Sequence, residues 1–293
     1  MINRENVAPR MIEFGHLERQ MSAFDSRYSA LNSTDFGNQI TSHILSECEK
    51  HRIELASADV FDTLLLRNDK SEAQRYFEIS GLIEQAIDAR VSATDLLITR
   101  FEAMELAYRA TGRINDTTEA DIRDVISSQV RSLGLPEGAK STMLQVEIQY
   151  EADNLTVNQP MLAALAALHE RGVKVILVSD MYLGGTVIAD IIALLEPRVD
   201  FIDYLFSSAD LKINKRSGTI FPFICSEFDV RPNRCFHTGD SLESDYRRAR
   251  AAGWHAFYHP VSNPELAARE QGLQTFIRTM LQANVDISRW AKI

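Results

Sequence analysis

The chain has 293 residues, of which 45% are apolar and 25% are charged; these values are typical of a globular protein and exclude a collagen-like or mostly disordered chain. Lysine and arginine number 31 against 41 aspartates and glutamates, so the formal net charge of −10 argues against a generic nucleic-acid binder or a polybasic membrane-surface protein. The length predicts one large domain, or a core with an inserted module.

The three cysteines, Cys48, Cys225 and Cys235, are scattered and form no CxxC pair. The sequence therefore predicts neither a zinc ribbon nor a disulfide framework, and a reducing, cytoplasmic compartment fits best. Residues 1–22 lack the apolar centre of a signal peptide. No apolar run approaches the roughly 20 residues needed to cross a bilayer, so no membrane association is expected.

The predicted elements begin with an N-terminal extension, residues 1–50, which is helical from about residue 35. A short strand at 53–61 follows and ends in acidic residues. A long helical stretch comes next, in which apolar residues recur at helical spacing, for example at Ile122, Ile126 and Val130. The spacing of Asp116 and Glu119 predicts a capping box for that helix.

After residue 158, strands predicted at 173–179, 204–207, 234–238 and 255–258 alternate with helices. Such alternation implies a parallel sheet that is covered on both faces. The predicted fold is therefore α/β: a doubly wound, Rossmann-like parallel sheet with an inserted helical domain and helical terminal extensions. Its predicted parts are an N-terminal extension (1–50), a core domain (51–68 and 155–262), a helical cap (69–154) and C-terminal helices (263–293).

Polar residues follow four of the predicted strands or helices. In chain order they are Asp59, Asp62 and Thr63, then Ser179 and Asp180, then Lys215, then Asp240 and Asp245. Ligands of open parallel sheets bind beyond the carboxyl ends of the strands, so these side chains should converge. Clustered carboxylates bind Mg²⁺, a lysine offsets negative charge, a hydroxyl can hold a phosphoryl oxygen, and a carboxylate can attack phosphorus. Taken singly each residue has an ordinary explanation, such as helix capping, and only their order favours phosphoryl transfer.

Four segments in this order resemble the motifs of the haloacid dehalogenase-like (HAD) superfamily. They are DVFDTLL at 59–65, VILVSD at 175–180, KRSG at 215–218 and HTGDSLESD at 237–245. The long helical stretch lies where this superfamily places its type-1 helical cap. The resemblance implies a hydrolase, and it covers 53–67 and about 158–258.

The resemblance also implies a role for each matching residue. Asp59 would be the nucleophile, Ser179 would hold the phosphoryl group, and Lys215 would orient Asp59 and screen its charge. The predicted catalytic residues are thus Asp59, Ser179 and Lys215. The predicted phosphate- or substrate-binding residues are Thr63, Ser179, Asp180 and Lys215. The predicted Mg²⁺ ligands are Asp59, the backbone carbonyl of Phe61, Asp240 and Asp245, of which Asp245 would act directly or through its neighbours.

One departure from the superfamily pattern concerns proton transfer. Phosphatases of the superfamily usually carry a second Asp two positions after the nucleophile, where it protonates the leaving group and then activates water. Here that position is Phe61, which cannot transfer a proton. General acid–base help is worth roughly 10²–10⁴-fold, so its loss matters. Asp62 is adjacent but is expected to point away.

Three functions stay open. The first is a Mg²⁺-dependent phosphohydrolase or phosphotransferase that acts on a small phosphorylated metabolite through an aspartyl-phosphate. The second is a metal-independent dehalogenase, because dehalogenases of the superfamily carry an aromatic residue where this chain has Phe61, although they typically lack the acidic metal motif. The third is a weakly active or non-catalytic member that serves as a binding or regulatory module.

The substrate is expected to be a small phosphorylated molecule and not a nucleic acid or a membrane. Segments 59–67 and 179–183 resemble a bacterial branch of HAD proteins that accompanies glycosyltransferases of surface-polysaccharide synthesis, which suggests a sugar phosphate. In or near the cap, Arg67, Arg100, Arg109 and Tyr108 could reach a polar substrate, although a surface position, or core packing for Tyr108, is the preferred explanation of each. His237 is expected to be a buried, hydrogen-bonded histidine. The oligomeric state and the role of residues 1–50 are not encoded in any motif.

Overall fold

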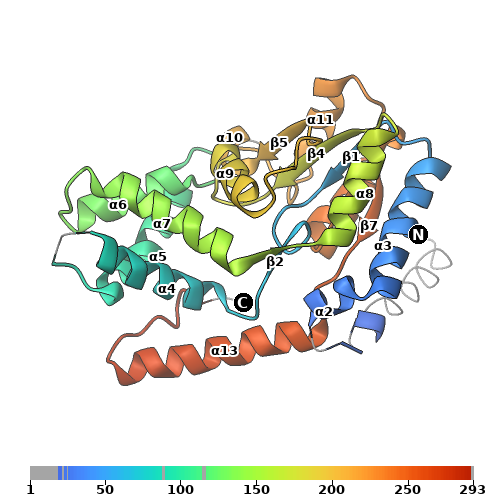
Figure 1. The fold of residues 1–293 in the computed structure, drawn as a ribbon. Coiled ribbons are helices and arrows are strands. Elements are labelled where there is room, and N and C mark those ends of the chain that lie inside the picture. The colour runs from blue at the N-terminus through green and yellow to red at the C-terminus, as the bar shows by residue number, and fades with distance from the viewer. Residues whose placement is uncertain (1–18, 22, 25, 88–89, 114–116, 292–293) are drawn as a thin grey trace, which may run out of the picture.

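The computed structural model describes residues 19–21, 23–24, 26–87, 90–113 and 117–291 (Figure 1). Its centre is a five-stranded parallel sheet in the order β5-β4-β1-β6-β7. The strands are β1 (Leu55–Ala58), β4 (Lys174–Ser179), β5 (Tyr204–Ser207), β6 (Cys235–Gly239) and β7 (His255–Tyr258). This architecture confirms the predicted α/β, Rossmann-like fold with a parallel sheet.

Alternate residues of the central strands face opposite sides of the sheet, and both sides are covered. In β4, Val175 and Leu177 belong to the larger apolar core, whereas Ile176 and Val178 belong to the smaller one. This follows from the two-residue repeat of a strand. Strands buried on both faces must be apolar throughout, which explains the uninterrupted apolar run of β4.

Helices from different parts of the chain cover the two faces. The larger core is completed by α3 (Thr34–Lys50), α8 (Gln159–Glu170) and α9 (Gly185–Leu195), and α3 lies alongside α8 (Figure 1). The smaller core is completed by α11 (Ile220–Phe228) and α12 (Arg248–Ala251). Short elements connect these helices to the strands: α10 (Ser208–Leu211) and a 3₁₀ turn at Pro232–Arg234.

Between β2 (Leu65–Arg67) and β3 (Leu155–Val157), which pair antiparallel, the described residues form four helices. They are α4 (Glu72–Ala86), α5 (Ala93–Ala110), α6 (Ile122–Ser132) and α7 (Ala139–Asn154), and α4, α5 and α6 each pack against the next, with α7 also against α4. We keep the names core domain and helical cap for the ranges proposed from the sequence.

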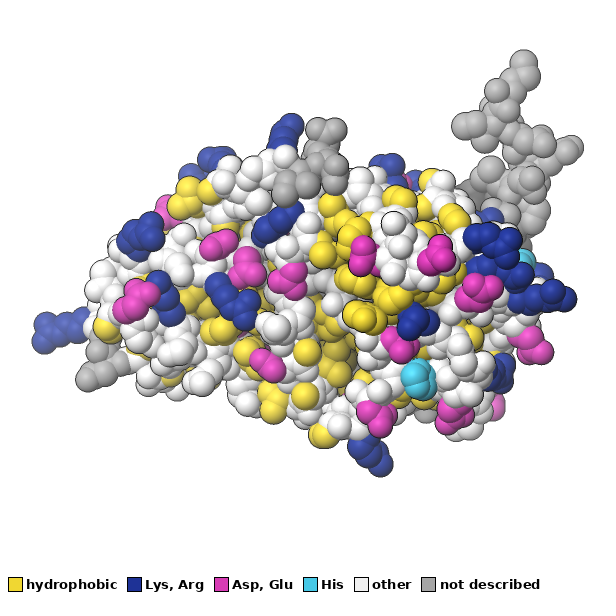
Figure 2. Space-filling view, turned by 90° about the horizontal axis from the view of Figure 1, so that it is seen from above, with side chains coloured by type: hydrophobic (Ala, Val, Ile, Leu, Met, Phe, Trp, Pro, Cys, Tyr) yellow, Lys and Arg dark blue, Asp and Glu magenta, His cyan; other side chains and the backbone are white. Residues whose placement is uncertain are grey.

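The terminal extensions contribute further helices to the described part of the chain. The short helix α2 (Arg27–Asn32) precedes α3, and the 20-residue α13 (Asn263–Gln282) runs along the lower edge of the molecule from α2 towards α4 (Figure 1). Among the described helices, none combines the length and apolarity that a bilayer span requires. On the face shown in Figure 2, basic and acidic side chains are intermixed.

Three local predictions need correction. The strand predicted at 53–61 is shorter, because β1 ends at Ala58 and the chain turns at the acidic residues. The helix predicted at 242–252 begins as a π-helix at Leu242–Arg247 and only then continues as α12. The N-cap of α6 is Asp121, whose side chain accepts a bond from the Arg123 N–H, so the predicted capping box is wrong; Asp116 lies outside the described residues.

The packing of α3 against its neighbours depends on a glycine. A Cβ at Gly37 would lie 2.4 Å from the Leu31 carbonyl oxygen and 2.8 Å from Cγ of Pro160. Because the Leu31 carbonyl oxygen cannot move away without distorting the backbone, we expect Gly37→Ala to lower the free energy of unfolding by about 1–3 kcal/mol, measured by urea denaturation.

Gly81→Ala is the matched control, since Gly81 lies inside α4 with nothing within 4 Å of its added Cβ. Alanine should raise stability there by about 0.5–1 kcal/mol, because it loses less backbone entropy than glycine. Equal effects of the two substitutions would contradict the close packing of α3.

Candidate active site

The first predicted site residue, Asp59, follows β1 directly. Its backbone N–H donates to the Thr238 carbonyl oxygen at 2.8 Å, which fixes the start of the loop to the neighbouring strand β6. Its buried carboxylate accepts a hydrogen bond from Nζ of Lys215. Asp59 is therefore a carboxylate held at the carboxyl edge of the sheet, in contact with a buried cation.

Lys215 is brought to this position by a carboxylate from another strand. Asp180, which follows β4, accepts hydrogen bonds from the backbone N–H of Lys215 at 2.8 and 2.9 Å and from that of Arg216 at 3.1 Å. These bonds hold the turn before α11, so Asp180 positions the lysine. The predicted substrate contact of Asp180 stays a prediction, and this positioning contact was not anticipated.

Asp245 is the second carboxylate that contacts Lys215, with Oδ1 2.7 Å from Nζ. Its Oδ1 also lies 3.0 Å from Nε2 of His237, and its Oδ2 accepts the Ser241 N–H at 2.9 Å. His237 is completely buried and contacts Ser57 through Nδ1 at 2.6 Å, as expected for a hydrogen-bonded histidine. Three donors thus hold Asp245 in one orientation.

Gly239 makes the approach of Asp245 sterically possible. A Cβ at Gly239 would lie 2.3 Å from Cγ of Asp245, so only glycine leaves room for the carboxyl group. The π-helix at Leu242–Arg247 directly follows this turn and carries Asp245 inward. Irregular helical turns of this kind are frequent at functional sites.

Three carboxylates form a cluster at this edge of the sheet. Oxygen atoms of Asp59, Asp240 and Asp245 lie within 4.8 Å of one another. Burial and the neighbouring Asp59 raise the pKa of Asp240 well above its ordinary value. For Asp59, burial raises the pKa to about 7, with Lys215 opposing and Asp245 adding to the rise.

The remaining charges show that the cluster is short of positive charge. Burial would lower the pKa of Lys215, but Asp245 and Asp59 outweigh it and keep the lysine protonated. Lys215 contacts two of the three carboxylates, Asp59 and Asp245, and a hard divalent cation with oxygen ligands would complete the balance. Asp59, the Phe61 carbonyl and Asp240 fit Mg²⁺ by the chemistry of their oxygen donors, with Asp245 supporting them.

Two predicted phosphate-binding hydroxyls lie nearby in the fold. Ser179 is the last residue of β4, the strand next to β1, and it is buried. Thr63 is fully buried in the loop between β1 and β2, residues 59–64, which we call the nucleophile loop after the role predicted for Asp59; its carbonyl accepts the Asn158 side-chain N–H at 2.8 Å. Its Oγ1 is buried and has no partner among the described residues. A buried hydroxyl without a partner is suited to a ligand oxygen.

Phe61, the residue in the position of the usual acid, is covered by a cation. The guanidinium of Arg67 lies 4.3 Å from the centre of the Phe61 ring, and its Nη2 is 3.3 Å from Sδ of Met181. Glu151 lies 3.8 Å from the same nitrogen. The side chain that usually transfers a proton is thus replaced by an arginine–aromatic pair.

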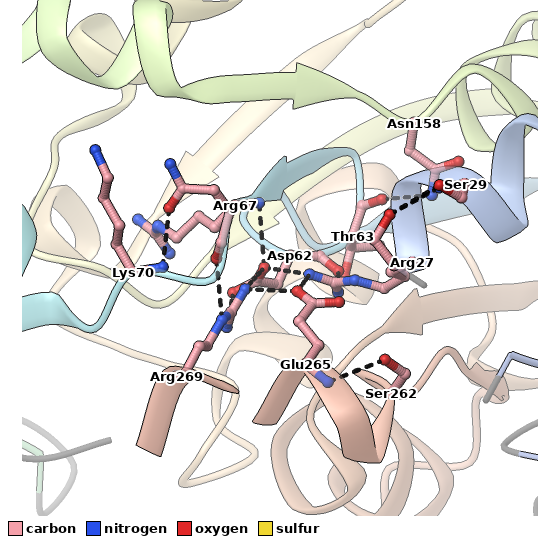
Figure 3. Close-up of polar contacts among 12 residues, drawn as sticks. Arg27, Ser29, Asp62, Thr63, Arg67, Lys70, Asn158, Ser262, Glu265 and Arg269 are labelled. Atoms are coloured by element: carbon pink, nitrogen blue, oxygen red, sulfur yellow. Dashed lines mark hydrogen bonds and ion pairs between the residues drawn. The ribbon is translucent and has the colours of Figure 1, made fainter. Parts of the chain in front are cut away.

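Asp62 is held by arginines from both terminal extensions (Figure 3). Arg27 of α2 donates to the Asp62 carbonyl at 2.6 Å and to its Oδ1 at 2.5 Å, and Arg269 of α13 donates to Oδ1 and Oδ2 at 2.9 and 3.1 Å. Asp62 itself has φ +62°, a left-handed conformation that Asp tolerates better than most residues. Its carboxylate is therefore fully occupied by hydrogen bonds from two arginines and does not replace the general acid that Phe61 cannot supply.

The other cap candidates divide into packed and peripheral residues. Arg100 is buried against Glu147 at 2.6 Å and belongs to the interior of the cap, whereas Arg109 is exposed and pairs with Glu105. Tyr108 lines a cavity of about 430 Å³ that also includes Asp180 and Arg216. Of these candidates, Tyr108 and Arg67 alone lie beside residues of the candidate site.

Comparison with known proteins is consistent with this geometry. A family model of haloacid dehalogenase-like hydrolases matches residues 53–253, and the chain therefore belongs to the haloacid dehalogenase-like hydrolase family. No protein of curated function gives a significant match.

Solved structures share the fold at low sequence identity. A 2-haloacid dehalogenase from Pseudomonas syringae pv. Tomato is 16% identical, with a TM-score of 0.51, over 71% of this chain and 86% of that one. A predicted phosphoglycolate phosphatase from Haemophilus somnus is 14% identical, with a TM-score of 0.41, over 73% and 91%. The family match establishes a hydrolase.

The ion pairs of Asp62 with Arg27 and Arg269 should contribute to the stability of the folded protein. Burial alone would raise the pKa of Asp62, but Arg27 and Arg269 outweigh it and hold the pKa well below its ordinary value. Breaking such a buried pair leaves cations unpaired, so Asp62→Asn should lower the free energy of unfolding by about 3 kcal/mol at pH 7.

Because folding lowers the pKa of the Asp62 carboxyl group, its ionised form stabilises the folded protein at pH values above the unfolded-state pKa. This stabilisation is lost as the pH falls. The difference between wild type and Asp62→Asn should therefore narrow below pH of about 4, in urea titrations at several pH values. Asp190→Asn, which changes an exposed carboxylate of α9, should have little effect. A pH-independent difference would contradict the assignment.

Proposed function

We propose that this protein is a Mg²⁺-dependent phosphohydrolase or phosphotransferase that acts on a small phosphorylated metabolite through an aspartyl-phosphate. The supporting observation is the cluster of Asp59, Asp240 and Asp245, whose oxygen atoms lie within 4.8 Å of one another, with Lys215 in contact with Asp59 and Asp245. A dehalogenase that needs no metal has no use for this concentration of negative charge.

In the proposed reaction, the Asp59 carboxylate attacks phosphorus and the bond from phosphorus to the ester oxygen breaks. Lys215 holds Oδ1 of Asp59 and offsets the charge that collects on the phosphoryl oxygens, assisted by the hydroxyls of Ser179 and Thr63. Bound Mg²⁺ would supply further charge compensation. Water then attacks phosphorus, the bond to Asp59 breaks, and inorganic phosphate leaves; an acceptor hydroxyl in place of water gives transfer.

The proton for the leaving oxygen is the difficult part of this reaction. Phe61 has no proton to give, and Asp62 is occupied by Arg27 and Arg269. The leaving group must therefore be stable as an anion or take its proton from solvent. This favours a substrate with a good leaving group, for which an anomeric sugar phosphate is one candidate.

A second candidate function is metal-independent dehalogenation, in which Asp59 attacks carbon and displaces halide. The aromatic residue Phe61 favours it, because a dehalogenase needs no general acid to expel a halide. A weakly active binding protein is the third reading of the same residue. We further propose that the phosphatase is located in the cytoplasm, because its three cysteines form no disulfide bond. We also propose that it binds neither nucleic acid nor a membrane.

The first test is phosphate release from a panel of phosphorylated metabolites with Mg²⁺ and with EDTA. Release should require the metal and fall at least 100-fold in Asp59→Asn, because the nucleophile is lost. Asp240→Asn should raise the Mg²⁺ concentration needed, while Asp190→Asn behaves as wild type. Metal-independent chloride release from 2-chloropropionate, with no phosphate release, would instead establish the dehalogenase.

The second test concerns Phe61. The rate of the wild type should fall steeply as the pKa of the leaving group rises, so p-nitrophenyl phosphate should far outpace alkyl phosphates. Phe61→Asp should raise the alkyl phosphate rate by about 10-fold, less than the roughly 10²–10⁴-fold that acid–base catalysis usually gives, since the adjacent Arg67 favours the ionised carboxyl.

Phe61→Asn is the control, because it has the shape of the aspartate variant and no acidic proton. Equal rates of the two variants would show that position 61 does not limit proton transfer in this protein.

A further inference from the structure

A second cavity, of about 390 Å³, lies where the nucleophile loop, the start of the cap and α13 meet. We call it the junction pocket, and the lining residues that matter are Asp62, Arg67, Lys70, Ser71, Arg75 and Arg269. Figure 3 shows Arg67, Lys70 and Arg269 gathered on one side of Asp62. The pocket is thus rich in cations and adjoins the loop that carries Asp59.

Among the described residues, Arg75 forms no ion pair although it is buried. Its side chain lies in the first turns of α4, it is 8% exposed, and its Nε and Nη1 are buried without a hydrogen bond. No carboxylate of the described residues forms an ion pair with it. Burying an unpaired guanidinium is costly, so such a group is expected to have an acceptor that is not part of this chain.

Other buried arginines show how unusual this is. Arg27 and Arg100 each leave Nε without a partner, but both form close ion pairs, with Asp62 and Glu147 respectively. Arg75 has no such pair.

A second lining arginine also offers an unused donor. The Nε of Arg67 is buried without a partner, while its guanidinium plane lies over Phe61. Arg67 and Arg75 both line this cavity, and together they carry three buried donor nitrogens without acceptors among the described residues.

The carboxylates around the pocket are already engaged or exposed. Asp62 is shared by Arg27 and Arg269, and Lys70 is paired with Glu78 at 2.6 Å. Glu72, which also lines the pocket, is exposed to solvent. None of them is therefore the missing acceptor of Arg75.

We propose that the junction pocket binds an oxyanion, a carboxylate or a phosphate group, held by Arg75 and Arg67 at the N-terminal end of α4. A guanidinium can bind such a group with two parallel hydrogen bonds, and the first turn of a helix favours negative charge. The anion would join the helical cap, through Arg75, to the nucleophile loop, through the stacking of Arg67 on Phe61. The pocket does not depend on the proposed phosphatase activity, because it uses none of the residues that the reaction requires.

The test is isothermal titration of inorganic phosphate in EDTA, with the full-length protein. Arg75→Met should weaken phosphate binding at least tenfold, because it removes the principal donor. Arg131→Met, which changes an exposed arginine of α6, should bind as wild type. Ser179→Ala should keep the phosphate binding that Arg75→Met weakens, which separates the pocket from phosphate bound at the catalytic cluster.

Stability distinguishes a ligand site from a structural role for Arg75. Without phosphate, Arg75→Met should be at least as stable as wild type, since it replaces an unpaired buried charge by an apolar chain of similar length. Phosphate should raise the melting temperature of the wild type and not that of the variant. If the methionine variant fails to fold, Arg75→Lys, which keeps the charge and loses the planar fork, should show weakened binding.

Kinetics identify the source of the anion. If it is a second acidic group of the substrate, Arg75→Met raises KM for substrates with two acidic groups and leaves KM for p-nitrophenyl phosphate unchanged. If it is a separate small anion, phosphate in the wild type changes the rate on p-nitrophenyl phosphate, and this effect is lost in the variant. If Arg75→Met leaves the affinity for phosphate unchanged, the proposed anion site is wrong and the proposed function is unaffected. If phosphatase activity survives in Asp59→Asn, only the proposed function is wrong.

Discussion

The geometry of the candidate site depends on one buried ammonium group shared by two carboxylates. Lys215 contacts both Asp59 and Asp245, which arrive from β1 and from the π-helix after β6. Without this cation the two carboxylates would repel each other in a region with little water. The turn that carries Lys215 is itself held by Asp180 after β4, so three strands are coupled through one side chain.

The core sequence predicted most of this arrangement, because its determinants are local. A run of apolar residues followed by acidic ones specifies a buried strand with a carboxylate at its end, as at Asp59 and Asp180. Parallel strands then bring these ends together whatever the connecting helices are. The motifs around Lys215 and Asp245 are similarly short, and their positions follow from the same topology.

Contacts between distant segments could not be predicted in this way. Nothing in the local sequence of Arg27 or Arg269 indicates that both reach Asp62, because that contact depends on how α2 and α13 dock. Asp62 was expected only to point away, and its left-handed backbone became evident from the structure. The missing hydrogen-bond acceptors of Arg75 could not be predicted from the sequence either, since they depend on which side chains surround it in the folded protein.

The pairing of Arg27 with Glu265 joins residues 238 positions apart, and both take part in the network around Asp62. During synthesis, which proceeds from the N-terminus, the sheet can assemble before α13 has left the ribosome. The nucleophile loop, however, gains its last supporting arginine only when that helix docks. Formation of the sheet and completion of the contacts around Asp62 are therefore separable in time.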